Sequence, residues 1–105
     1  MNCSGGTMGQ EKNFENRVKK WLREQGCYVI KHYGCGNTRA GVPDLIICAN
    51  GRFVAVELKA EDGEVSKLQV AHMNHIFEAG GSCFVLRPSD FENFKAYITD
   101  VMNEC

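Results

Sequence analysis

The stretch GVPDLIICANGRFVAVELK, residues 41–59, decides the fold of this 105-residue chain. Two apolar runs flank the pair Asn50-Gly51, which is the strongest short-range sequence signal for a two-residue type I′ hairpin turn. The hairpin has two apolar faces away from its charged end: Ile46, Cys48, Phe53 and Ala55 on one, and Leu45, Ile47, Val54, Val56 and Leu58 on the other. A sheet of this kind must be covered on both sides.

The hairpin register brings two acids together. With Asn50-Gly51 in the turn, Asp44 lies directly opposite Glu57, and Lys59 projects from the same face because side chains alternate along a strand. Like charges in this position are destabilising unless a cation or a shared proton compensates. Carboxylate oxygens suit Mg²⁺ or Mn²⁺, which indicates phosphate ester chemistry. The simpler alternative is that Lys59 pairs with one of the acids on a solvated face.

Length and composition indicate one ordinary globular domain. Apolar residues make up 44% of the chain and charged residues 24%, and the net charge is −1. A nucleic-acid role therefore depends on local basic clusters rather than on an overall basic field. The sequence contains neither an apolar run of about 18 residues nor a secretory signal, so we expect a cytoplasmic protein without membrane contact. In that setting the six cysteines are expected to be reduced thiols.

The remaining elements follow from periodicity and from turn and cap signals. Residues 1–10 are predicted to form a flexible tail, and residues 11–105 a single domain. Within the domain we expect a helix over 11–25, strands over 27–33 and 82–86, the hairpin, a helix over 66–79 and a last helix opened by a Ser89–Glu92 capping box. The predicted order is α-β-β-β-α-β-α, an α/β fold.

Several polar residues have both a structural and a functional interpretation. Glu15 borders the apolar stripe of the first helix, either pointing at the sheet as a third acid or favoured there by the helix dipole. The loop over residues 34–43 contains Thr38 and Arg39, which suit phosphate contacts, although a plain connector is equally consistent. Gln69 completes a capping box with Ser66 and also lies where it can face the cleft.

The last helix carries an aromatic surface. This surface contains Phe91, Phe94, Tyr97 and Ile98. Two uses are open: packing on the chain's own sheet, or forming a dimer interface. Size-exclusion chromatography with light scattering distinguishes a dimer from a monomer.

The motifs resemble a known nuclease family. Asp44, then twelve residues, then Glu57-Leu58-Lys59 matches the PD-(D/E)XK signature. The words TRAGVPDL (38–45), VELK (56–59) and SKLQ (66–69) are similar to those of VRR-NUC domains, which are small, stand-alone and often phage-borne nucleases of that superfamily. The resemblance spans residues 13–87 and implies the superfamily's nuclease core, a mixed four-stranded sheet flanked by helices.

Carried over to this chain, the resemblance implies a role for each site residue. Asp44 and Glu57 become metal ligands, with the Leu58 backbone carbonyl as a third and Glu15 touching the metal directly or through water. Lys59 orients or activates water and stabilises charge on the phosphate, and Gln69 completes the site. The implied substrate contacts are Thr38, Arg39, Ser66 and Lys67.

The function implied is that of an Mg²⁺- or Mn²⁺-dependent endodeoxyribonuclease. Stand-alone members of the family resemble Holliday junction resolvases, so we expect branched or structured DNA as substrate and a homodimer that makes paired cuts. The alternative is a module that binds branched DNA without cutting it, or a nuclease subunit that works with a helicase partner. The complete set of Asp44, Glu57 and Lys59 favours cleavage, because a pure binder has no need of a destabilising acid pair.

Overall fold

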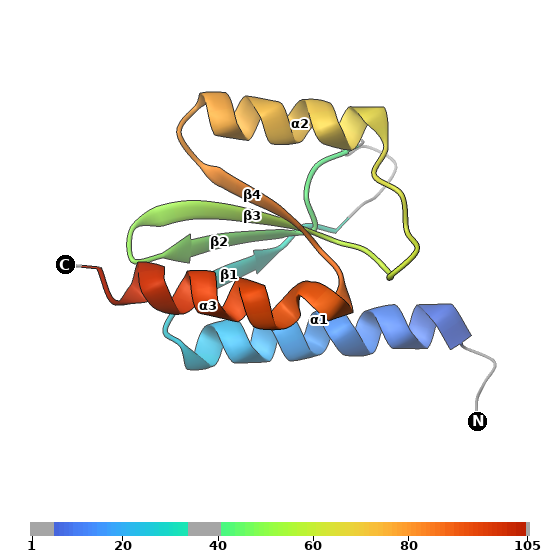
Figure 1. Ribbon diagram of the computed structural model, residues 1–105, viewed down its shortest axis with the longest axis horizontal. Helices are drawn as coiled ribbons and strands as arrows, with labels where there is room; N and C mark the ends of the chain where they lie inside the picture. The colour runs from blue at the N-terminus through green and yellow to red at the C-terminus, as the bar shows by residue number, and fades with distance from the viewer. Residues whose placement is uncertain (1–5, 34–40, 105) are drawn as a thin grey trace.

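The computed structural model describes residues 6–33 and 41–104 and has the predicted element order. The elements are α1 (Gly6–Glu24), β1 (Tyr28–Lys31), β2 (Leu45–Ala49), β3 (Arg52–Leu58), α2 (Lys67–Glu78), β4 (Ser82–Leu86), the short 3₁₀ helix η1 (Pro88–Asp90) and α3 (Phe91–Met102). Figure 1 shows one sheet with helices on both sides. The predicted α/β class is confirmed.

The β2–β3 hairpin has the predicted turn and register. Asn50 and Gly51 have φ angles of 51° and 81°, and a type I′ turn requires positive φ at both positions. β2 and β3 pair antiparallel with Ala49 opposite Arg52 and keep that register along their length. The Asn50 amide Nδ2 donates to the Val101 carbonyl at 2.9 Å, which attaches the turn to the end of α3.

The sheet is mixed, with the strand order β1-β2-β3-β4. The first three strands are antiparallel neighbours, and β4 pairs parallel to β3. A parallel neighbour requires a crossover connection, which here contains α2. The result is that the carboxyl ends of β3 and β4 lie at the same edge of the sheet, beside the start of β2.

The core lies on one face of the sheet, which α1 and α3 cover together (Figure 1). The side chains that fill it, each at most 5% exposed, include Leu45, Ile47, Val54 and Val56 from the sheet, Phe14, Val18 and Leu22 from α1, and Phe91, Phe94 and Ile98 from α3. The aromatic side of α3 therefore packs on the chain's own sheet and is not available as a dimer interface.

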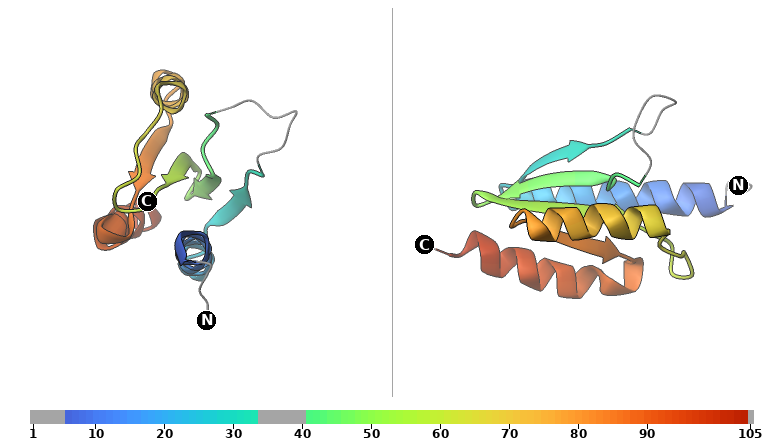
Figure 2. Two further views of the ribbon diagram at one scale, coloured as in Figure 1. Left: turned by 90° about the vertical axis from the view of Figure 1, so that its right-hand side faces the viewer. Right: turned by 90° about the horizontal axis from the view of Figure 1, so that it is seen from above.

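The other face of the sheet is only partly covered. α2 lies over β4 at one side and contains no buried residue, as Figure 2 shows from the end of the sheet. Phe53 remains 46% exposed on β3, and Tyr28 and Ile30 remain 69% and 48% exposed on β1. The predicted four-stranded sheet flanked by helices is thus confirmed, with one face covered fully and the other in part.

Two predicted boundaries were wrong. α1 begins at Gly6 rather than at residue 11, so residues 6–10 belong to the helix and not to a tail. Of the two glycines in these residues, Gly6 is the first residue of the helix and Gly9 lies within it, where a glycine costs only about 1 kcal/mol and does not stop the helix. The Ser89–Glu92 capping box is also absent. Ser89 instead donates its backbone N–H and its hydroxyl to the two carboxylate oxygens of Glu61, at 2.6 and 2.8 Å.

Two further findings concern the class of protein. Over residues 6–33 and 41–104, the helices are too short or too polar to cross a membrane. Cys27, Cys48 and Cys83 are free thiols, as predicted for these three positions.

Candidate active site

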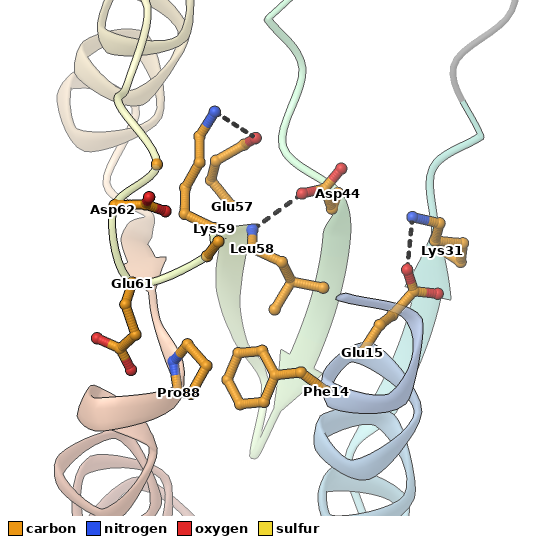
Figure 3. Close-up of a pocket in the computed structure, with 12 residues that line it drawn as sticks. Phe14, Glu15, Lys31, Asp44, Glu57, Leu58, Lys59, Glu61, Asp62 and Pro88 are labelled. Carbon is orange, nitrogen blue, oxygen red and sulfur yellow. Dashed lines mark hydrogen bonds and ion pairs between the residues drawn. The ribbon is translucent and has the colours of Figure 1, made fainter. Parts of the chain in front are cut away.

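Asp44 and Glu57 lie at the same edge of the sheet, as the hairpin register predicted. Asp44 directly precedes β2, and its backbone carbonyl accepts a hydrogen bond from the His32 N–H at 2.8 Å, which extends the β1–β2 pairing. Its side-chain Oδ2 accepts from the Leu58 N–H at 2.9 Å, across the hairpin (Figure 3). The backbone therefore fixes the direction of the Asp44 carboxylate towards the end of β3.

Glu57 is a buried acid, only 5% exposed. Burial, and after it the negative charge of Asp44, raise the pKa of its carboxyl to about 7 against the opposing charges of Lys59 and Lys31. Its Oε1 is buried without a hydrogen-bond partner among the described residues. A buried carboxylate oxygen in this state is costly unless a cation or proton reaches it.

Gln69 connects this acid to the start of α2. The side-chain Oε1 of Gln69 accepts a hydrogen bond from the Ser66 backbone N–H at 2.8 Å. The backbone N–H of Gln69 donates to the Ser66 hydroxyl at 3.1 Å, and the two bonds confirm the predicted capping box. Its Nε2 donates to Glu57 Oε2 at 2.6 Å. The side-chain amide of Gln69 thus both caps α2 and orients Glu57, so the structural and the functional interpretations of Gln69 are compatible. Ser66 and Lys67 are exposed at the helix start.

Lys59 projects beside Glu57, with its Nζ 4.0 Å from Glu57 Oε2 and its side chain 20% exposed. It lines a cleft of about 890 Å³ together with Asp44 and Glu57 (Figure 3). The opposite wall of this cleft is formed by Glu15 and Lys31. The structure therefore brings two lysines, Lys31 and Lys59, and five acids to one opening; the acids are Glu15, Asp44, Glu57, Glu61 and Asp62.

Glu15 is in the cleft wall but has different partners. Its Oε1 lies 3.1 Å from Lys31 Nζ and its Oε2 lies 3.0 Å from Lys19 Nζ. Among the described residues, no three His, Cys, Asp or Glu side chains gather closely enough to hold a metal ion. In this structure the Glu15 carboxylate is thus paired with lysines, on the wall of the cleft that faces Asp44 and Glu57.

Sequence reasoning missed Lys31. Its place near the acids follows from the pairing of β1 with β2, because Lys31 lies opposite Leu45, the residue after Asp44. Finding it required the β1 register, which no turn signal provides. Thr38 and Arg39, predicted to contact substrate, lie outside the described residues.

The donors at the edge of the sheet fit a hard divalent cation. Two carboxylates lie together, one with an unpartnered buried oxygen, and the Leu58 carbonyl belongs to the strand end between Glu57 and Lys59. Mg²⁺ is commonly held by one or two carboxylates and completes its shell with water and substrate phosphate. Two acids and a carbonyl are thus sufficient protein ligands.

Comparisons with known proteins agree with this architecture. A solved structure described as a VRR_NUC domain matches with a TM-score of 0.69 and 24% identity, covering 85% of this chain and 94% of that one. A structure of Archaeoglobus fulgidus Hjc, a Holliday junction resolvase from an archaeal hyperthermophile, matches with a TM-score of 0.56 and 19% identity over 73% and 69% of the two chains. At these identities the matches show a shared fold. Among curated proteins, none matches significantly.

The family assignment comes from the sequence match. The family model for the archaeal Holliday junction resolvase (Hjc) matches residues 8–87, which include the whole sheet, α2 and most of α1. The resemblance to resolvase-like nucleases inferred from the motifs is thereby confirmed, and the chain belongs to the family of archaeal Holliday junction resolvases.

Proposed function

We propose that this resolvase-like nuclease is a divalent-metal-dependent endonuclease that hydrolyses phosphodiester bonds in branched DNA. The observation that supports this most is the buried Glu57, held against Asp44 with one oxygen lacking a hydrogen-bond partner, at the floor of a cleft that also contains Lys59. A folded protein keeps such a costly acid pair where a cation is to be bound.

In this proposal Asp44, Glu57 and the Leu58 carbonyl hold the metal ion. A divalent ion at this place would polarise the scissile phosphate and lower the pKa of an attacking water. The Leu58 N–H keeps Asp44 aimed at the site, and Gln69 keeps Glu57 aimed there through its Oε2, which leaves Oε1 for the cation. Both acids are thus oriented before any ion arrives.

Lys59 supplies positive charge at the reacting phosphate. Its side chain is mostly buried beside Glu57, so its ammonium is less screened than one on an open surface. The phosphate gains negative charge as water attacks, and a cation already in position stabilises that state without reorganising. Lys59 also donates hydrogen bonds that orient the attacking water.

Cleavage of a branched substrate requires two active sites, which a dimer supplies. A four-way junction is resolved by two paired cuts, and the described residues of one chain supply one set of Asp44, Glu57 and Lys59, which lines one cleft. A homodimer with two-fold symmetry supplies two identical sites. We infer that the partly covered face of the sheet is the surface through which two copies associate.

That face has the properties of an interface. Phe53 lies in a groove of about 450 Å³ between β3 and the second half of α2, with Ile76 in its wall. Tyr28, Ile30 and Phe77 are also about half or more exposed. An apolar surface of this kind is normally covered by a partner, and a two-fold axis sets the same patch of two copies against each other.

The test of the proposed activity is cleavage of four-way, flapped, single-stranded and supercoiled DNA with Mg²⁺ or Mn²⁺. We expect cutting of the branched substrates that stops when EDTA removes the metal. Asp44→Ala and Lys59→Ala should remove cleavage while circular dichroism shows an intact fold. Metal-dependent cleavage retained in either variant would contradict the proposal.

The interface is tested separately, by size-exclusion chromatography with light scattering. The wild type is expected to be a dimer, and Phe53→Glu a monomer. Lys20→Glu on the exposed side of α1 is the matched charge-changing control and should remain dimeric. A monomeric wild type would exclude paired cutting by a stable dimer.

A further inference from the structure

The turn that follows β3 forms the wall of the cleft next to Lys59. The Gly63 N–H donates to the Ala60 carbonyl at 3.0 Å, which closes a turn over residues 60–63. All four of its residues line the cleft, and Figure 3 shows Glu61 and Asp62 on the same side of it as Lys59. We call residues 60–63 the cleft turn.

The side chain of Lys59 is restrained by packing rather than by a close polar partner. Its Nζ lies 4.0 Å from Glu57 Oε2, which is too far for a hydrogen bond. Its stem lies against the cleft turn, because a methyl group added at Gly63 would be 3.4 Å from Lys59 Cδ. The φ angle of Gly63 is not positive, so its backbone conformation does not itself require glycine. The position of the turn therefore limits where the Lys59 ammonium can lie.

Arg87 holds the cleft turn from the end of β4. Its Nη2 donates to the Gly63 carbonyl at 2.7 Å in a partly buried hydrogen bond, which is charge-assisted and therefore stronger than a neutral one. The preceding residue, Leu86, accepts from the Lys59 N–H at 3.0 Å. The same strand end thus fixes the backbone of Lys59 and, through Arg87, the turn against which its stem packs.

A second contact holds the other side of the cleft turn. The carboxylate of Glu61 accepts both hydrogen bonds from Ser89 that were described above, but these lie in an exposed position. Arg87 is the better shielded of the two supports. It is not among the described residues that line the cleft, so its effect on the reaction would pass through the turn.

We propose that Arg87 is a positioning residue for Lys59: its hydrogen bond to Gly63 holds the cleft turn against the lysine stem and keeps the ammonium group at the scissile phosphate. The inference rests on the proposed nuclease function, in which Lys59 stabilises that phosphate and orients the attacking water. A displacement of about 1 Å at a reacting group reduces a rate by up to about 10²-fold. A residue outside the cleft therefore controls cleavage without touching DNA.

Three variants and a control test this role. Arg87→Gln removes the guanidinium, and Arg87→Lys keeps a cation and a donor. Gly63→Val leaves the carbonyl that Arg87 binds but pushes on the Lys59 stem. Arg52→Gln is the matched control, because Arg52 also makes one short contact, 2.6 Å to Glu104, but lies at the opposite end of β3 from the cleft. Circular dichroism melting curves set a temperature at which every variant is folded.

The first measurement is the single-turnover rate of four-way junction cleavage in Mg²⁺ at saturating protein. Arg87→Gln and Gly63→Val should each reduce the rate by about 10- to 100-fold. Arg87→Lys should restore most of it, and Arg52→Gln should match the wild type. A rate for Arg87→Gln equal to that of Arg52→Gln would overturn the inference and leave the nuclease function intact. A wild type that cleaves no DNA would overturn both together.

The second measurement separates positioning from direct DNA contact and from general damage to the cleft. Junction affinity in Ca²⁺ is measured against NaCl concentration, and Mn²⁺ binding without DNA is measured by calorimetry. Arg87→Gln should keep the wild-type values of both, whereas loss of a direct phosphate contact would reduce the slope of log K against log[salt] by about one. A reduced slope would make Arg87 a DNA ligand, and lost Mn²⁺ binding would make it a support of the whole cleft; either result would overturn the inference.

Discussion

Glu57 and Glu15 are both buried carboxylates on the same cleft, yet their surroundings have opposite effects. Glu57 lies against Asp44, and burial with this second negative charge raises its pKa to about 7. Glu15 is buried to a similar degree, but Lys19 and Lys31 lower its pKa. Burial alone therefore does not mark a metal ligand. Among the described residues, both Glu15 oxygens lie close to a lysine ammonium, whereas Glu57 Oε1 has neither a lysine nor a hydrogen-bond donor beside it and is the oxygen best placed for a cation.

The largest difference between the two acids is expected in cleavage. Glu57→Gln should reduce Mg²⁺-dependent cleavage on the order of 10³-fold or more, because it removes a metal ligand. Glu15→Gln should reduce it less, because the Glu15 carboxylate is already paired with Lys19 and Lys31. Single-turnover rates on a four-way junction measure both, with Asp100→Asn on the exposed side of α3 as a control. Equal losses for the two acids would break the comparison.

The pH dependence of the unfolding free energy should also distinguish Glu57 from Glu15. The folded protein holds the Glu57 proton more tightly than the unfolded chain does, since the ordinary pKa is 4.5 and the folded value about 7. The stabilisation is complete below pH 4.5 and is lost as pH rises through 7. Metal-free protein should lose about 3 kcal/mol of unfolding free energy from this group.

Urea unfolding in EDTA at a series of pH values measures this loss. Glu57→Gln should flatten the dependence between pH 5 and pH 8 and unfold at higher urea than the wild type at pH 8. A wild type whose stability stays constant or rises over this interval would contradict the assigned environment of Glu57.

Substitution of Gln69 tests whether its hydrogen bond orients Glu57 for catalysis. Gln69→Glu keeps the oxygen that accepts from Ser66 N–H but loses the donor to Glu57 Oε2 and adds a third carboxylate. We expect Mg²⁺-dependent cleavage to fall by about 10- to 100-fold, the usual effect of losing a group that orients a ligand. The melting temperature in the absence of metal should fall further as pH rises. Cleavage at the wild-type rate would show that Gln69 only caps α2.

The smallest expected effect is the contribution of Glu15 to stability, which disappears at low pH. Its pKa is lowered by Lys19 and Lys31, so its stabilisation is present above pH 4.5 and is lost as pH falls below that value. Glu15→Gln should cost about 1.5 kcal/mol at pH 7, the contribution of a charged hydrogen bond. The curves for wild type and variant should converge at low pH. A constant gap down to pH 3 would mean that the loss comes from packing rather than charge.

The sequence was sufficient for the parts of the site that local chemistry determines. The Asn50-Gly51 turn fixed the register, and the register placed Asp44 opposite Glu57, because a two-residue turn leaves no freedom to slip. The capping box likewise placed Gln69 at the start of α2. These predictions depended on contacts within one hairpin or one helical turn.

What the sequence did not predict depends on contacts between distant elements. Lys31 meets Glu15 only because α1 packs beside β1, and nothing in either segment alone specifies that pairing. Ser89 has a good capping sequence, but Glu61 from the loop after β3 takes its donors instead. The open face of the sheet was missed for the same reason. Apolar alternation shows that a face needs cover, not which chain provides it.

The proposed cation site lies between Asp44 and Glu57, apart from the lysine-paired Glu15. Anomalous diffraction from crystals soaked in Mn²⁺ tests it most directly, because it locates the ion without relying on activity. We expect a peak bounded by the carboxylates of Asp44 and Glu57, with Glu15 still paired to Lys19 and Lys31. A peak coordinated by Glu15, or no peak between Asp44 and Glu57, would contradict it.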